Sequence, residues 1–487
     1  MAPVLRVLTL LTVVVHACVC APADHRADAG PGEGEGEGEG EGEGEGEGEG
    51  EGEGEGEGEG EGEGEGEGEG EGEGEGEGEG EGEGEGDLGW PLDDALPTPC
   101  APSNLDVPGG SPWDGWGNVQ HPPTLSGTVG VESAPIYGQL YQAGATEAAG
   151  QAPGMEAELL VGPLGSSPLG EGRCWRNVSA TFNVQVDNND EYQARVTPTV
   201  VGLFAYAYRY RPNGGAWRYA DLDGTDDGFA PGDLGVLVVD DVEARPLVIA
   251  TLNLRCRTDD WSARRPLVID ALARVRPDLV ALQEECASST PQLDDLVPDL
   301  AVALGRGFAS RRVGTHAAVW PEGTFDEGVA VLSAHPIEDS GTLDLPWVNF
   351  ARKAQWVDVT VRGTPLRLVA THLDVGANAS QARVDAATAI LALAPVDRAL
   401  VVAGDMNDVP GSAAIGTFTA ALVDLWARAN PAQPGLTFPA ASPAERIDFV
   451  LAAPSLATSL TGARLLDERA GATTASDHLG VAVALSP

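Results

Sequence analysis

The segment ALVVAGDMND, residues 399–408, places an apolar run directly before a group of polar side chains. Ala399 to Gly404 is short and rich in β-branched residues, which predicts a buried β-strand. Asp405 and Asn407 follow at once, two positions apart in the loop that leaves the strand. Strand ends are common positions for side chains that act on a ligand, because a rigid sheet can hold them in place.

The same alternation of buried strand and polar loop extends through the second half of the chain. Two amphipathic helices are expected, at Trp261–Val275 and Ser380–Leu393. Many strands, few helices and about 240 residues predict two packed sheets flanked by helices. The other expected strands are Leu247–Leu254, Asp278–Gln283, Gly328–Leu332, Trp356–Val361, Leu366–His372, Ile447–Leu451 and Gly480–Leu485.

Polar groups lie at the ends of most of these strands, in a fixed order along the chain. Each fragment alone would occur by chance, whereas the ordered set is specific. The groups are Asn253, Gln283-Glu284, Thr371-His372-Leu373-Asp374, Gly404-Asp405-Met406-Asn407, Arg446-Ile447-Asp448 and Ser476-Asp477-His478.

In this order the set resembles the endonuclease/exonuclease/phosphatase superfamily, which includes pancreatic-type deoxyribonucleases, abasic-site endonucleases, neutral sphingomyelinases and inositol polyphosphate phosphatases. The resemblance covers residues 246–487 with no departure at these six places. It implies an α+β fold, the four-layer α/β-sandwich of the DNase I-like type. It also implies a metal-dependent hydrolase of phosphodiesters, either a nuclease or a phospholipase C-type enzyme or phosphatase.

The resemblance also implies a metal site. Glu284 would be the principal ligand, with Asn253 and Asp477 in or near the same shell. Hard oxygen ligands favour Mg²⁺, with Mn²⁺ and Ca²⁺ as alternatives. Asp405 would orient or deprotonate water, and Asn407 would stabilise the non-bridging phosphate oxygens.

Three further residues complete the implied catalytic set. His478 is the candidate general base, Asp448 would hold its imidazole, and His372 would contact the phosphate or serve the leaving group. The division of acid and base roles among them stays open. A strand-end Asp or a lone His is often only structural, and that alternative is preferred for Asp408 as a turn cap.

Three neighbouring residues carry open alternatives. Arg352 is a candidate phosphate-binding residue, against the alternative of a surface ion pair. Glu327 is a candidate partner of His372. Glu285 is expected either to face solvent or to contact the metal ligands without binding the metal itself.

The N-terminal region predicts export and a long spacer. Residues 1–21 are typical of a signal peptide, and Cys18 is a candidate lipid anchor. Residues 22–86 form a linker that is mostly strict Glu-Gly alternation, expected to be disordered because it offers no apolar side chain to bury. The repeat contains 27 glutamates. The net charge of the whole chain is −49, so the residues outside the repeat carry −22. The linker is either a stalk or low-complexity filler. No further segment reaches transmembrane length.

Between the spacer and the catalytic half, residues 87–123 are expected to be linker and residues 124–244 a β-sandwich accessory module. Expected strands include Leu159–Val161, Ala180–Val184, Tyr192–Val201 and Leu203–Tyr210. The aromatic residues could form a sugar-binding face for a polysaccharide or cell surface, or pack in the core: Tyr206, Tyr208, Tyr210, Trp217 and Tyr219. Four acidic residues fit a hairpin turn better than a calcium loop: Asp221, Asp223, Asp226 and Asp227.

Four cysteines remain outside the export region, an even number that is compatible with disulfides in an exported chain. Three pairings are open, and proximity in the sequence favours Cys256–Cys286 and Cys100–Cys174.

Charge weakens the nuclease interpretation without removing it, because Lys353 is the only lysine and no basic cluster appears along the sequence. A basic patch assembled in the fold stays open, from Arg255, Arg257, Arg264, Arg265, Arg311 and Arg312. The leading interpretation is a secreted or cell-surface metal-dependent phosphodiesterase that acts on nucleic acid or a phospholipid head group. The alternative is a surface-binding protein that uses the β-module, with the hydrolase-like half as a non-catalytic scaffold.

Overall fold

The computed structural model describes residues 90–92, 115–169, 174–224, 233–240 and 245–486. The expected signal peptide and Glu-Gly spacer lie outside these residues, as do Cys18, Cys100, Asp226 and Asp227. Across the described chain, no helix is both long and apolar enough to cross a membrane.

Residues 115–240 form two sheets whose facing side chains share one core, which includes Leu140, Leu159 and Tyr208. The first sheet has the order β1-β3-β7-β6 and the second β2-β10-β8-β4-β5, with β9 beside β8. The strands are β1 (Gly115–His121), β2 (Thr124–Thr128), β3 (Ile136–Gln142), β4 (Met155–Pro163), β5 (Arg176–Ser179), β6 (Thr181–Val186), β7 (Asn189–Ala194), β8 (Gly202–Pro212), β9 (Arg218–Ala220) and β10 (Gly235–Asp240).

Two boundaries in this region differ from the sequence-based expectation. The strand β1 falls in the stretch expected to be linker, and its Val119 is buried. The strand expected over Tyr192–Val201 ends at Ala194. Pro198 has no N–H to donate to a ladder, and the chain between the two strands runs outside the sheet.

The aromatic residues of β8 and its neighbours pack in the core. Tyr206, Tyr208 and Tyr210 are fully buried, and Trp217 and Tyr219 are nearly so. They therefore do not form an exposed sugar-binding face. Asp221 is also buried, and its Oδ1 accepts a hydrogen bond from the backbone N–H of Gly224 at 3.1 Å, as in a turn.

The C-terminal half is built from two six-stranded sheets with the orders β13-β14-β12-β11-β24-β21 and β15-β16-β17-β18-β20-β19. The first comprises β11 (Leu247–Asn253), β12 (Leu279–Ala287), β13 (Ala309–Trp320), β14 (Gly323–Ser333), β21 (Leu460–Leu466) and β24 (Gly480–Leu485). The second comprises β15 (Asp339–Leu345), β16 (Arg352–Val361), β17 (Thr364–His372), β18 (Ala399–Asp405), β19 (Val423–Asp424) and β20 (Asp448–Ala452). A small ribbon pairs β22 (Arg469–Ala470) with β23 (Thr473–Thr474).

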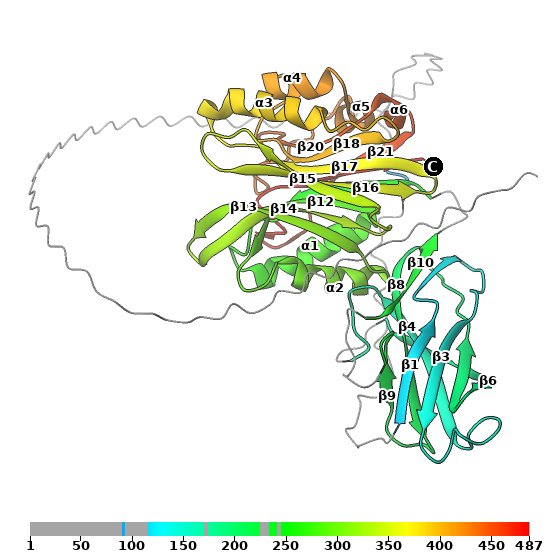
Figure 1. The fold of residues 1–487 in the computed structure, drawn as a ribbon. Helices are drawn as coiled ribbons and strands as arrows, with labels where there is room; N and C mark the ends of the chain where they lie inside the picture. The colour runs from blue at the N-terminus through cyan, green and yellow to red at the C-terminus, as the bar shows by residue number, and fades with distance from the viewer. Residues whose placement is uncertain (1–89, 93–114, 170–173, 225–232, 241–244, 487) are drawn as a thin grey trace, which may run out of the picture. The chain divides into compact units, whose positions relative to one another are not determined.

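Three apolar cores define four layers in this half (Figure 1). Ile249, Val357 and Val401 belong to the core between the two sheets. The outer face of the first sheet packs on α1 (Trp261–Val275) and α2 (Leu293–Leu304), and that of the second on α3 (Ser380–Leu391) and α4 (Ala413–Thr419). Shorter helices are η1 (Ala377–Ala379), α5 (Leu425–Ala429) and α6 (Pro454–Ala457). The described C-terminal half is thus an α/β fold with a helix–sheet–sheet–helix order.

The disulfide of this half joins Cys256, in the loop after β11, to Cys286 at the end of β12. Both residues are fully buried beside Phe325. The bond ties together the two chain segments that carry Asn253 and Glu284. The pairing considered for Cys174 involves Cys100 and lies outside the described residues.

Candidate active site

The strand register brings three of the candidate side chains side by side in the second sheet. In the parallel pair β17–β18, His372 is opposite Asp405, and in the antiparallel pair β18–β20, Asp405 is opposite Asp448. Gly404 makes this approach possible, because a Cβ there would lie 2.0 Å from the carbonyl oxygen of Thr371, at a φ of 154°. The order of these strands therefore fixes the centre of the site.

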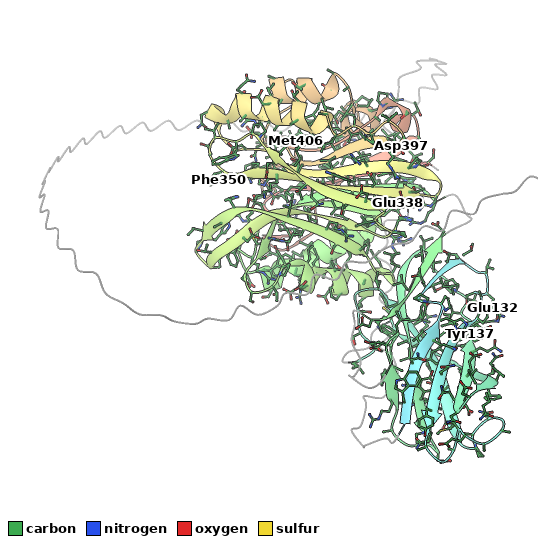
Figure 2. The ribbon with its side chains drawn as sticks, viewed as in Figure 1. Glu132, Tyr137, Glu338, Phe350, Asp397 and Met406 are labelled. Carbon is green, nitrogen blue, oxygen red and sulfur yellow. A yellow bond between two sulfur atoms is a disulfide. The ribbon has the colours of Figure 1, made fainter. Side chains whose placement is uncertain are left out.

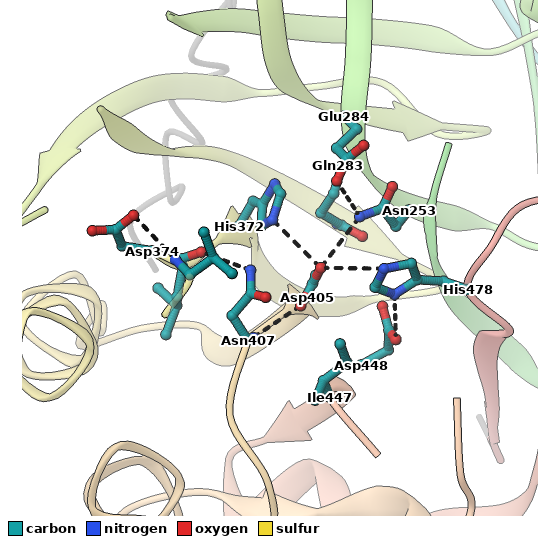
Figure 3. Close-up of polar contacts among 12 residues, drawn as sticks. Asn253, Gln283, Glu284, His372, Asp374, Asp405, Asn407, Ile447, Asp448 and His478 are labelled. Atoms are coloured by element: carbon teal, nitrogen blue, oxygen red, sulfur yellow. Dashed lines mark hydrogen bonds and ion pairs between the residues drawn. The ribbon is translucent and has the colours of Figure 1, made fainter. Parts of the chain in front are cut away.

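Asn253 connects this centre to the first sheet. Its Nδ2 donates to Glu284 Oε1 at 3.0 Å and to Asp405 Oδ2 at 3.2 Å (Figure 3). Glu284 lies beside an irregularity in the β12–β14 register and has a φ of 49°. A left-handed conformation is rare for a residue other than glycine, and such strain is often kept at functional sites. The bulge turns the Glu284 side chain toward the cleft.

His478 is held between two carboxylates. Its Nδ1 lies 3.0 Å from Asp448 Oδ2, and its Nε2 lies 3.7 Å from Asp405 Oδ2. Burial alone would lower the pKa of His478, but the negative charges of Asp448 and Asp405 outweigh it and raise the pKa to about 10. Phe438 covers the ring, with centroids 4.8 Å apart. At neutral pH this side chain is an imidazolium that can donate a proton from Nε2.

His372 has the opposite environment. Burial, and then the positive charge of Arg352, hold the pKa of His372 well below its usual value. Arg352 Nη1 lies 3.0 Å from His372 Nδ1, and a guanidinium can only donate. Nδ1 must therefore be unprotonated, so His372 is neutral and carries its proton on Nε2. That nitrogen lies 3.4 Å from Asp405 Oδ2.

Arg352 forms an ion pair, which is buried rather than exposed. It is 5% exposed and donates to Glu327 Oε1 at 3.2 Å. Glu327 Oε1 lies 3.9 Å from His372 Nδ1, so Glu327 reaches this histidine mainly through Arg352. Both residues still line the active-site cleft. Glu285 is fully buried and pairs with Arg312, so it does not face solvent.

The loop after β18 orders Asn407. Its backbone N–H donates to Asp405 Oδ1 at 2.8 Å, and its Nδ2 donates to the carbonyl oxygen of Leu373 at 3.0 Å. These bonds hold Asn407 in a left-handed backbone conformation, with a φ of 46°. Asp408 points elsewhere: its Oδ2 accepts from Arg383 Nε at 3.0 Å, and its Oδ1 accepts from the N–H of Val409, as a turn residue does.

A cleft of about 740 Å³ opens over these groups. Asp477 lines it and forms an ion pair with Arg255, which itself follows Asn253 by two positions. All eight residues of the implied catalytic and metal set therefore line the cleft or contact a residue that does. The cleft also includes His316, Trp320, Phe350, Val375, Phe438 and Glu445.

Negative charge is concentrated in the cleft. Burial, followed by the nearby charge of Glu327, raises the pKa of Glu284, and burial raises that of Asp405. Asp448 Oδ1 is buried without a hydrogen-bond partner among the described residues. Asp405, Asp448 and His478 also present ligand atoms within 4.8 Å of one another. A hard divalent cation suits a cleft with these crowded carboxylates, because it prefers oxygen ligands and would offset their charge. Of the ligands that the resemblance implies, Glu284 and Asp477 line the cleft and Asn253 contacts Glu284, so these three residues would hold the cation.

The raised pKa of Glu284 predicts a pH-dependent stability in the presence of a chelator. Between pH 4.5 and about 8 the native carboxyl keeps a proton that the unfolded chain has released. The free energy of unfolding contributed by this group must then fall as pH rises through that window. Urea denaturation from pH 5 to pH 8 measures it. Glu284→Gln should show a smaller fall than wild type; equal slopes would contradict the assignment.

Several residues of the site carry no clear signal in the sequence. Phe438 is distant from His478 along the chain and reaches it only in the fold. Arg255 is one of many arginines, and its pairing with Asp477 depends on a turn in which its φ is 52°. Asp374 was visible within the Thr371–Asp374 motif, but its role as an acceptor for backbone N–H groups of residues 348–350 was not.

Comparison with known proteins confirms the family resemblance of the C-terminal half. The model of the Endonuclease/Exonuclease/phosphatase family matches residues 250–478. No curated protein gives a match. Among solved structures, a family protein from Leptotrichia buccalis is 16% identical, covering 49% of this chain and 99% of its own, with a TM-score of 0.43. The human Nocturnin catalytic domain is 15% identical, covering 49% and 93%, with a TM-score of 0.41.

A mannosyl-6-phosphatase from Bacteroides thetaiotaomicron is also similar, at 19% identity, with 49% of this chain and 98% of its own covered and a TM-score of 0.38. Members of the matched family are generally hydrolases of phosphoester bonds. Residues 250–478 of this chain are thus identified as similar to the Endonuclease/Exonuclease/phosphatase family.

Proposed function

We propose that this protein is an exported phosphodiesterase that uses a divalent cation, with Mg²⁺ the expected ion, to hydrolyse a P–O bond. The observation that carries the proposal is the convergence of side chains from both sheets on one carboxylate. Asp405 Oδ2 lies 3.2 Å from Asn253 Nδ2, 3.4 Å from His372 Nε2 and 3.7 Å from His478 Nε2. This is the position at which an attacking water and a phosphate oxygen would meet.

The protonation states suggest a division of labour. When bound, the cation would supply charge neutralisation at the phosphate. Asp405 has a raised pKa and would orient the attacking water and accept its proton. The His478 imidazolium, held by Asp448, would donate hydrogen bonds to the charge that develops on phosphorus-bound oxygens. His372 would donate from Nε2 to a phosphate oxygen. Two histidines with pKa values shifted in opposite directions fit two different roles.

The proposal predicts release of p-nitrophenol from bis-(p-nitrophenyl) phosphate by the purified full-length chain. Mg²⁺ or Mn²⁺ should support turnover, and a chelator should abolish it. Absence of turnover with Mg²⁺, Mn²⁺ and Ca²⁺ would contradict the proposal. It would favour the alternative, in which the hydrolase-like half is a non-catalytic scaffold. Parallel assays with duplex DNA, sphingomyelin and inositol phosphates would then separate the substrate classes.

A non-catalytic scaffold is not favoured. Such a protein would have no reason to keep a left-handed Glu284 or a carboxylate pair around His478. Polysaccharide or cell-surface contact by residues 115–240 stays a separate proposal. It would require surfaces other than the buried tyrosines of β8.

A further inference from the structure

Exposed apolar side chains surround one side of the active-site cleft. We name this set the apolar rim: Val319, Trp347, Val348, Phe350 and Val375. Their side chains range from 40% exposed for Val375 to 82% for Val319. Val319, Phe350 and Val375 line the cleft itself, beside Glu284 and His478. Large exposed apolar groups gathered at one place usually mark a contact surface.

The rim is held in a fixed conformation. Asp374 is buried, and its carboxylate accepts hydrogen bonds from the backbone N–H groups of Val348, Asn349 and Phe350 at 2.6, 2.8 and 3.1 Å. Asn349 and Asn378 exchange side-chain hydrogen bonds at 3.0 and 2.9 Å. The two loops that carry the other rim residues are thus joined to each other, whereas Val319 lies in β13. Because the backbone that carries Trp347 and Phe350 is already ordered, binding through these side chains would cost little additional conformational entropy.

The rim offers no charge to a partner. Residues 346–350 contain no ionisable side chain. Both carboxylate oxygens of Asp374 accept hydrogen bonds from backbone N–H groups of this segment. Lys353, the only lysine of the sequence, pairs with Asp344 at 3.5 Å. Arg352 is buried against Glu327, while five carboxylates line the cleft: Glu284, Glu327, Asp405, Glu445 and Asp477.

We propose that the apolar rim docks the enzyme on a bilayer of zwitterionic phospholipid, and that the cleft takes the phosphate of such a head group. The inference rests on the proposed phosphodiesterase function. Trp, Phe and Val insert favourably at the boundary between head groups and acyl chains. Single-stranded nucleic acid would need cations along a groove as well as aromatic side chains, and an anionic membrane would need a basic patch. A neutral surface is the partner that matches a neutral rim in an acidic protein.

Vesicle co-sedimentation with the full-length protein tests the inference. Wild type should bind phosphatidylcholine vesicles, and Trp347→Ser/Val348→Ser should weaken binding at least about tenfold, since the pair removes two groups that are buried on insertion. Neither residue lines the cleft or contacts a reacting group, so this variant should still hydrolyse soluble bis-(p-nitrophenyl) phosphate. Val396→Ser is the matched control: Val396 is fully exposed and adjacent to Asp397, which lies at the opposite end of the domain from Phe350 (Figure 2).

The outcomes separate the docking inference from the proposed function. Equal vesicle binding by wild type and the double variant would overturn the docking inference. So would a wild-type protein that does not bind phosphatidylcholine vesicles, or that binds only when phosphatidylserine is present. Binding of a single-stranded oligonucleotide that is lost in the variant would also overturn it and identify a base-stacking surface. If vesicles bind as expected but no soluble diester or phospholipid is cleaved, the docking surface stands and the proposed enzymatic function fails.

Discussion

Glu284→Gln is expected to lower metal-dependent hydrolysis of bis-(p-nitrophenyl) phosphate by at least about 10³-fold, a loss in the range of removing an essential electrostatic group. The substitution keeps the shape of the side chain and an acceptor oxygen for Asn253 Nδ2, which lies 3.0 Å away. It removes one negative charge from the principal candidate metal ligand. The change should therefore act on cation binding rather than on folding.

A metal-dependent thermal shift distinguishes this explanation from general damage. Wild type should gain melting temperature when Mg²⁺ or Mn²⁺ is added, and Glu284→Gln should gain much less. Glu338→Gln is a control of the same chemistry, because Glu338 forms a surface ion pair with Arg398 at 2.7 Å and lies away from the cleft (Figure 2). Full activity in Glu284→Gln would show that Glu284 is not a metal ligand of the active site.

The centre of the site could be predicted from sequence because its residues lie at strand ends. A short apolar run followed by Asp405 and Asn407 specifies both the strand and the position of the polar groups relative to it. Helix α1 has the predicted bounds, Trp261–Val275, since its apolar spacing and the Asp260 cap are both local. Helix α3 begins where expected and ends two residues early, at Leu391, where boundaries are least determined by pattern.

Other features depend on contacts that no local pattern encodes. The left-handed backbone at Glu284 arises where β12 loses register with β14, and both the bulge and its partner strand are tertiary. The sequence made Arg352 a candidate for phosphate, but whether it pairs with Glu327 or faces solvent depends on the packing of β14 against β16. Likewise, the tyrosines of β8 could face sugar or core until a second sheet was known to cover them.

The two histidines show why a motif locates a site better than it assigns roles. Both lie beside the end of a strand and both have an aspartate within two positions, so the local sequence does not distinguish them. In the fold, His372 receives a hydrogen bond from a guanidinium, whereas His478 lies between two carboxylates. Their pKa values consequently move in opposite directions. Acid and base roles follow from these neighbours and not from the order of residues along the chain.

Asp448→Asn is expected to lower kcat on the order of 10³-fold at pH 7, because it removes the carboxylate that keeps His478 charged. Asp448 Oδ2 lies 3.0 Å from His478 Nδ1 and is the largest cause that raises this pKa to about 10. An asparagine amide carries no charge, so burial should lower the pKa of the His478 imidazole and less of it should be charged at pH 7. The raised pKa keeps the His478 imidazole charged below about pH 10, so wild type is expected to lose activity as pH rises through that value.

The pH profile of kcat is the decisive measurement for this pair. In Asp448→Asn the loss of activity on the alkaline side should move to lower pH, so that the active pH range narrows toward the acidic loss caused by protonation of Asp405. Asp358→Asn is the control, because Asp358 is a buried carboxylate that pairs with Arg367 at 2.7 Å outside the cleft. Combining Asp448→Asn with His478→Ala should add little to the histidine substitution alone, since the carboxylate acts through the ring. Additive losses of kcat in the double variant would show that Asp448 does not act through His478. An unchanged alkaline side of the pH profile in Asp448→Asn would show the same.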